Sequence, residues 1–234
     1  MGLAATKKLK QQLRQAANRK KADILSRFFK TAPGEYGYGD VFLGITVPQQ
    51  RSIARHFSML SLPDIRSLLI SKIHEERFSA IVILVNQFRA ADEKRQKKIY
   101  TFYLKHTARI NNWDLVDASA PHIMGTYLLT QQRTILYALA ASHSLWERRI
   151  AIVATLAFIR NNEFSDTLKI AELLLVDKHD LIHKAVGWML REVGKRSENT
   201  LKQFLNQNYH IMPRTMLRYA IERLTPSEQK RYCA

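Results

Sequence analysis

The sequence predicts an all-α fold built from stacked pairs of helices, and three observations carry this prediction. From Leu9 onward, apolar residues recur three and four positions apart, which is the period of one helix face. Strand-like alternation is almost absent, and only eight glycines and six prolines interrupt the 234 residues. Four similar segments also recur along the chain. Together these features favour helices in a repeated arrangement.

The repeated segments define the architecture more closely. They read ERFSAIVIL (76–84), ERRIAIVAT (147–155), IHKAVGWML (182–190) and LRYAIERL (217–224), and they align on Ala80, Ala151, Ala185 and Ala220. The intervals are about 71, 34 and 35 residues, so a further member is expected near Val116. A period near 35 with two helices per unit predicts a right-handed, curved solenoid of HEAT-like helix pairs with a basic concave groove. A plain helical bundle would show similar apolar stripes and remains the alternative.

A single domain over residues 1–234 is expected, in three parts. Residues 1–32 read as a basic N-terminal helix, which would bind a polyanionic partner, cap the solenoid, or do both. Residues 33–48 form a loop that holds four of the eight glycines, and connection is its expected role. Residues 49–234 form the repeat array.

Composition restricts the class of partner. The chain carries 37 Lys and Arg against 20 Asp and Glu, and its pI of about 10.1 is typical of a protein that binds a polyanion. The single cysteine, Cys233, excludes a disulfide framework and a cysteine metal cage. No apolar run is long enough to cross a bilayer. We therefore expect a cytoplasmic protein that makes no membrane contact.

Common cofactor and metal motifs are absent from the sequence. Neither GxxxxGK[ST] nor a GxGxxG loop after a strand occurs, so no nucleotide site is expected. The segment HDLIH places His179 and His183 four residues apart, but no third metal ligand accompanies them. We expect no metal and no cofactor.

An acid beside an aromatic residue stands out in this basic chain. The segment INNWDLVDASAP (110–121) places Trp113 and Asp117 four residues apart, so on a helix they share one face. Asp114 follows Trp113 directly and lies on a different face, where a solvated or capping role is expected. The segment falls at the repeated position near Val116.

A second tryptophan has basic neighbours. In IHKAVGWMLREVGK, Trp188 shares a helix face with Lys184, Arg191 and Lys195. Such a face suits phosphate contacts by the cations and ring contacts by the indole. A buried structural tryptophan is the alternative interpretation.

Two adjacent arginines begin another repeated helix, in SLWERRIAIVATLAFI. The apolar stripe of that helix leaves Arg148 or Arg149 at the groove edge, where a guanidinium would bind phosphate or pair with Asp117. A salt bridge between helices is equally compatible with the sequence.

These segments, in this order and spacing, resemble the signature segments of the AlkD-type DNA alkylation repair family of HEAT-like-repeat DNA glycosylases. The segments FLGITVPQQRSIARHF (42–57) and HEERFSAIVILVNQF (74–88) also read like that family, and the resemblance covers residues from about 40 to 225. It implies a site of two tryptophans, one aspartate and one arginine, which fall on Trp113, Trp188, Asp117 and Arg149. The adjacent Arg148 leaves the choice of arginine open.

The resemblance also implies an activity. A monomer would hydrolyse the N-glycosidic bond of cationic N3- or N7-alkylpurines in duplex DNA and leave an abasic site, without enclosing the base in a pocket. Arg148, Lys184, Arg191 and Lys195 would bind the DNA. A noncatalytic scaffold that binds DNA or RNA by charge, and a solenoid that recognises an acidic protein, remain as rivals.

Overall fold

The structure, a computed structural model, describes residues 2–233, with side chains from residue 4 to residue 232. Within this range helices are joined by turns and loops, and Val41 and Ile73 form an isolated β-bridge. The all-α prediction is confirmed. The chain divides into two compact units, Met1–Ser119 and Ala120–Ala234, and the single domain predicted over 1–234 stays a prediction. No described helix is long and apolar enough to span a bilayer.

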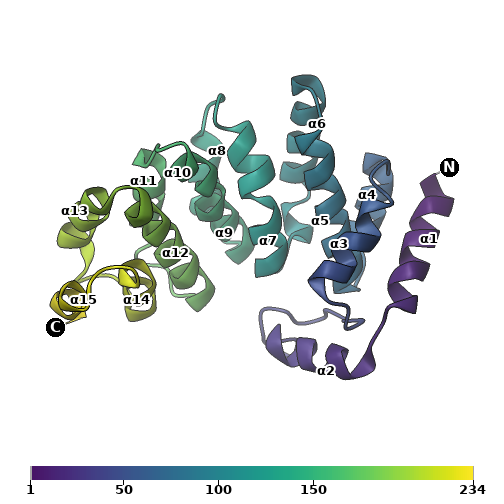
Figure 1. The fold of residues 1–234 in the computed structure, drawn as a ribbon, viewed down its shortest axis with the longest axis horizontal. Coiled ribbons are helices and arrows are strands. Elements are labelled where there is room, and N and C mark those ends of the chain that lie inside the picture. The colour runs from purple at the N-terminus through teal and green to yellow at the C-terminus, as the bar shows by residue number, and fades with distance from the viewer. Residues whose placement is uncertain (1, 234) are drawn as a thin grey trace. The chain divides into compact units, whose positions relative to one another are not determined.

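The first unit is organised around one buried helix, α5. Every residue of α5 from His74 to Val85 is buried, and this helix packs against α3, α4, α6 and α7. The helices of the unit are drawn in purple to teal in Figure 1: α1 (Gly2–Gln15), α2 (Arg19–Phe28), α3 (Val47–Arg55), α4 (Leu62–Leu69), α5 (His74–Arg89), α6 (Glu93–Lys105), the 3₁₀ turn η1 (Thr107–Arg109) and α7 (Trp113–Ser119).

The basic N-terminal segment forms two helices, so the prediction of one helix over residues 1–32 is wrong. The break falls between α1 and α2, where Asn18 caps α2 by accepting the Lys21 N–H with its side chain. The backbone N–H of Asn18 donates to the Leu43 carbonyl, 2.8 Å away. The apolar periodicity of the sequence runs through this point without a break. In the structure Asn18 instead caps the start of a new helix, and its own N–H is bound to the loop at Leu43, so α1 does not continue into α2.

The glycine-rich loop is anchored to the core rather than acting only as a connection. The buried Glu75 carboxylate accepts the N–H groups of Leu43 (3.0 Å), Gly44 (2.8 Å) and Ile45 (3.3 Å). Gly44 has a φ of +81°, and a Cβ there would lie 2.1 Å from the Asn18 carbonyl oxygen. A side chain at this position is therefore excluded by both conformation and space.

The second unit is centred on the long helix α12, which packs against α9, α13 and α14. Its elements, teal to yellow in Figure 1, are the π-helical turn η2 (Pro121–Gly125), α8 (Thr134–Ala140), α9 (Leu145–Ala154), α10 (Leu156–Arg160), α11 (Ser165–Leu173), α12 (Asp180–Arg196), α13 (Glu198–Asn208), α14 (Arg214–Ile221) and α15 (Pro226–Cys233).

The repeated alanines lie at helix contacts. Ala80 in α5, Ala151 in α9, Ala185 in α12 and Ala220 in α14 are all buried, and so is Val116 in α7. Small side chains at these positions let neighbouring helices approach closely. The alignment therefore marks buried positions of the packed helices.

Candidate functional site

Helix α7 carries the first pair of predicted site residues. Its buried side, which includes Leu115, Val116 and Ser119, faces the packed interior of the first unit, and Ser119 Oγ lies 2.9 Å from the hydroxyl of the buried Tyr103. Trp113 and Asp117 are both half-buried. Because they lie one helical turn apart, the indole and the carboxylate share one face of α7.

Two aromatic rings hold the Trp113 indole. Phe29 stacks on it, with ring centroids 5.1 Å apart and an interplanar angle of 11°. Phe28 meets it edge-on at 5.9 Å and is itself 61% exposed. The position of this tryptophan therefore depends on the end of α2 as well as on α7.

Asp117 lies within electrostatic reach of the buried Tyr103. Burial raises the pKa of Tyr103 above its ordinary value, the Ser119 hydrogen bond opposes that rise, and the Asp117 carboxylate adds to it. The negative charge of Asp117 therefore disfavours ionisation of the buried Tyr103 hydroxyl.

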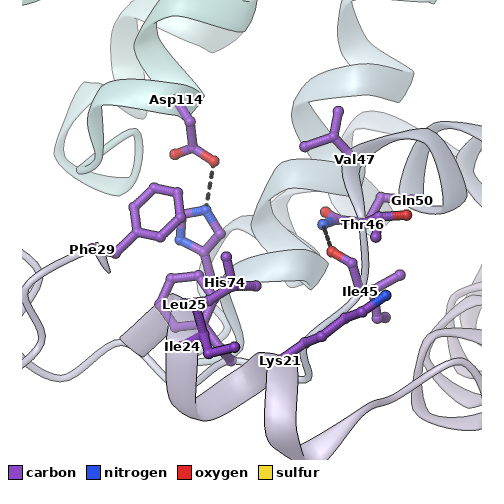
Figure 2. Close-up of a pocket in the computed structure, with 12 residues that line it drawn as sticks. Lys21, Ile24, Leu25, Phe29, Ile45, Thr46, Val47, Gln50, His74 and Asp114 are labelled. Carbon is purple, nitrogen blue, oxygen red and sulfur yellow. Dashed lines mark hydrogen bonds and ion pairs between the residues drawn. The ribbon is translucent and has the colours of Figure 1, made fainter. Parts of the chain in front are cut away.

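Asp114 belongs to a buried ionic network, so of its two expected roles the solvated charge is wrong. The capping role fits the structure, because Asp114 lies in the first turn of α7 and its Oδ1 accepts the Leu115 N–H over 2.8 Å. Its Oδ2 lies 2.8 Å from Nε2 of His74 (Figure 2), and its side chain is 14% exposed. On the other side of the ring, His74 Nδ1 lies 3.1 Å from Oδ2 of Asp40. Arg77 and Asn112 donate to that same oxygen over 2.6 Å and 3.3 Å. Beside the network opens an apolar pocket of about 180 Å³, lined in part by Leu25, Phe29, Phe42 and Ile45.

The charges in this network stabilise one another. Burial by itself would lower the pKa of His74, but the Asp114 carboxylate and the hydrogen bonds from Asp114 and Asp40 raise it to about 9. Burial likewise opposes ionisation of Asp40, but the hydrogen bond to His74 and the Arg77 charge hold the Asp40 pKa below its ordinary value. At neutral pH the imidazole is therefore protonated and donates to both carboxylates.

The two adjacent arginines of α9 have different surroundings. Arg148 donates from Nε to Asp177 (2.6 Å) and from Nη1 to the carbonyls of Ser142 and His143. Arg149 is 5% exposed and donates to the Leu181 carbonyl (2.5 Å), at the start of α12. Thus Arg148 is engaged by an internal acid, and Arg149 links two helices of the second unit.

The predicted stripe on α12 is present, with an acid beside each cation. Lys184 pairs with Asp180 (2.6 Å), Arg191 with Glu222 of α14, and Lys195 with Glu192 (2.6 Å). The half-buried Trp188 donates from its indole nitrogen to the same Glu192 oxygen over 3.2 Å. The stripe is therefore close to neutral, and a phosphate would have to replace carboxylates there.

The two histidines of HDLIH, His179 and His183, make hydrogen bonds to backbone groups of the second unit. His179 caps α12 by accepting the Leu181 N–H (3.1 Å), and His183 Nε2 donates to the Asp177 carbonyl (2.5 Å). In the described part of the chain, no group of three or more His, Cys, Asp or Glu side chains is arranged to hold a metal ion.

The predicted residues fall in both units. Trp113 and Asp117 lie in the first unit, and Arg148, Arg149, Lys184, Trp188, Arg191 and Lys195 lie in the second. Sequence reasoning missed His74, Phe29 and Asp40, which hold the start of α7. One signal was present: HEER places four ionisable residues directly before an apolar run, and all four are buried.

Comparisons with known proteins agree with this fold. A family model described as DNA alkylation repair enzyme matches residues 9–224. A solved structure titled a predicted DNA alkylation repair enzyme from Enterococcus faecalis has a TM-score of 0.72 at 18% identity, covering 90% of this chain and 97% of that one. AlkD2 from Streptococcus mutans has a TM-score of 0.56 at 14% identity, covering 88% and 98%. No curated protein matches the sequence.

Proposed function

Because the chain belongs to the DNA alkylation repair enzyme family and so has a role in DNA repair, we propose that it is a DNA glycosylase for cationic alkylpurines. It hydrolyses the N-glycosidic bond of an N3- or N7-alkylpurine in duplex DNA and leaves an abasic site. The observation that carries this proposal is the half-buried Trp113 and Asp117 pair on one face of α7.

The chemistry gives the carboxylate a specific role. An N-alkylated purine carries a positive charge and is a good leaving group, so it needs little help from a general acid. The deoxyribose left behind develops oxocarbenium character, which a nearby carboxylate stabilises while it aligns the attacking water. The faces of Trp113 and Trp188 add a smaller stabilisation of the cation–π kind. The reaction needs no metal and no cofactor.

Positive charge supplies the affinity for DNA. Between Lys7 and Lys30 the chain has nine Lys and Arg residues and one acid, Asp23. Arg19, Lys20, Lys21 and Lys30 are exposed and suit contacts with phosphates. In the second unit, the cations of α12 and Arg148 would contact phosphates where phosphate replaces their carboxylate partners. Arg149, which also lies next to α12, is the proposed site arginine.

Base release from a defined lesion tests the proposal. Duplex DNA with a single 7-methylguanine is incubated with wild-type protein and with Asp117→Asn, and free base and alkali-labile sites are measured. We expect wild-type protein to release the base and Asp117→Asn to do so about a hundredfold more slowly. Asp23→Asn removes one exposed negative charge from the same unit and serves as the matched control.

The outcomes separate the rival functions. Equal rates for wild-type protein and Asp117→Asn would contradict the role assigned to this carboxylate. If neither protein releases base above background while both bind DNA, the noncatalytic scaffold is the better description. For Trp188→Ala we expect a larger loss in turnover than in nonspecific binding, since its proposed contact is with the reacting sugar.

A further inference from the structure

His74, at the start of α5, links the glycine-rich loop to the start of α7. Its ring is 2% exposed and lies between the carboxylates of Asp114, on α7, and Asp40, on the glycine-rich loop. Asp40 reaches α7 by a second route as well. The buried Asn112 donates to Asp40 over 3.3 Å and accepts the Trp113 N–H over 2.8 Å. Both routes end within one residue of the Trp113 indole.

We propose that His74 is a positioning residue for base excision, which holds the start of α7 between the Asp40 and Asp114 carboxylates and so sets the place of Trp113 and Asp117. This inference rests on the proposed function. His74 touches no reacting atom and acts through α7. A small displacement of aligned groups is costly in catalysis, because the reacting atoms must approach closely in the correct orientation.

The surroundings of His74 favour a rigid tether. Asp114 faces the ring from α7, Asp40 faces it from the loop, and Arg77 lies on α5 itself. The rings of Phe42 and Phe29 lie 4.6 Å and 5.0 Å from the imidazole by their centroids. In such an apolar setting charged hydrogen bonds are stronger than in water. The protonated ring donates to both acids, whereas a neutral ring donates to only one.

The neighbours of His74 on α5 allow a structural role to be separated from a positioning role. Glu75 binds the backbone of residues 43–45, and Glu76 pairs with Lys10 and Arg14 of α1. Both glutamates are buried charges at the same helix start, but Glu75 contacts the loop and Glu76 contacts α1, and neither of these partners is on α7. Glu76→Gln is therefore a matched control for His74→Gln.

The first test compares these two variants in excision under single-turnover conditions with saturating protein. We expect His74→Gln to lower the rate about tenfold with little change in DNA affinity. Glu76→Gln should lower the melting temperature similarly and leave the rate unchanged. The double variant His74→Gln/Asp114→Asn should lose less than the product of the single effects, because both act on one contact. Equal rate losses in His74→Gln and Glu76→Gln, or an unchanged rate in His74→Gln, would overturn the proposal.

The second test needs no excision activity. With Trp146 and Trp188 replaced by phenylalanine, the emission of Trp113 is followed from neutral to alkaline pH. We expect a transition near pH 9, the pKa of His74, and its loss in His74→Gln. A missing transition, or one that persists in His74→Gln, would show that His74 does not position the indole. If wild-type protein fails to excise the base but Trp113 titrates with His74, the glycosylase proposal fails and the tether to α7 stands.

Discussion

Trp113 and Phe29 stack nearly parallel, with ring centroids 5.1 Å apart and an interplanar angle of 11°. Phe29 also stacks on Phe42, with ring centroids 5.0 Å apart, and its ring lies 5.0 Å from the imidazole of His74. The residue that follows α2 therefore links the glycine-rich loop, the buried network and the tryptophan of α7. The adjacent Phe28, which is 61% exposed, touches Trp113 only by its edge.

This difference predicts unequal effects at two neighbouring phenylalanines. Phe29→Ala removes a buried ring and should lower the free energy of unfolding by about 3 to 5 kcal/mol. Phe28→Ala should cost about 1 kcal/mol or less, because that ring is largely in water already. Urea unfolding, followed by Trp113 emission in a protein without the other two tryptophans, measures both. Comparable losses in the two variants would show that the buried Phe29 ring contributes no more to stability than the exposed Phe28 ring.

Variants of the two adjacent arginines of α9 should differ in their effects, with Arg148 contributing mainly to stability and Arg149 mainly to the excision rate. Replacing Arg148 with alanine leaves Asp177, whose side chain is 5% exposed, without its guanidinium, and should cost about 3 kcal/mol of stability. Arg149→Lys keeps the charge but loses the planar fork, and should lower the excision rate about tenfold or more. Arg148→Lys is the comparison, and with saturating protein we expect its excision rate to fall less than that of Arg149→Lys, because its proposed contact is with phosphate and not with the reacting sugar. A rate loss confined to Arg148→Lys would identify Arg148 as the site arginine.

Two glycines on α12 provide a test of helix packing near Trp188. A Cβ on Gly187 would lie 2.5 Å from the Met216 carbonyl oxygen and 2.5 Å from Tyr219 Cβ, both on α14. Gly187→Ala should therefore destabilise the second unit by about 2 kcal/mol. At Gly194 the nearest atom is the Leu201 Cδ2 methyl, also at 2.5 Å but at the end of a flexible side chain. Gly194→Ala should be nearly neutral, since alanine favours the helix by about 1 kcal/mol. Denaturant midpoints compare the two.

The contribution of His74 to stability should decline at alkaline pH. Its pKa is about 9 in the folded chain against 6.5 in the reference state, so folding favours the protonated ring. The resulting stabilisation, at most about 3 to 4 kcal/mol, is complete below pH 6.5 and is lost as the pH rises through about 9. Because other groups also titrate, the measured quantity is the difference in unfolding free energy between wild-type protein and His74→Gln. A difference that stays constant or grows with pH would contradict the protonated state.

The helices and their contact faces follow from the sequence because they depend on local periodicity. The alignment on Ala80, Ala151, Ala185 and Ala220 identified buried positions in four helices, and these positions are buried. Likewise, spacing by four placed Trp113 and Asp117 on one face of α7, and the basic stripe around Trp188 on one face of α12. Apolar periodicity did not predict the break at Asn18, where a helix cap and a hydrogen bond to Leu43 interrupt an otherwise continuous helical pattern.

The partners of the charges were decided by tertiary structure alone. Asp114 reads as a surface acid, and only the approach of α5, 40 residues away in sequence, brings it to His74. Glu75 binds loop amides and Arg148 meets Asp177 for the same reason. Helical periodicity reports which face a residue occupies, whereas the state of an ionisable group depends on which distant groups are packed against that face. The sequence therefore determines the helical repeat and the placing of the candidate residues within it, and long-range packing determines how they are held.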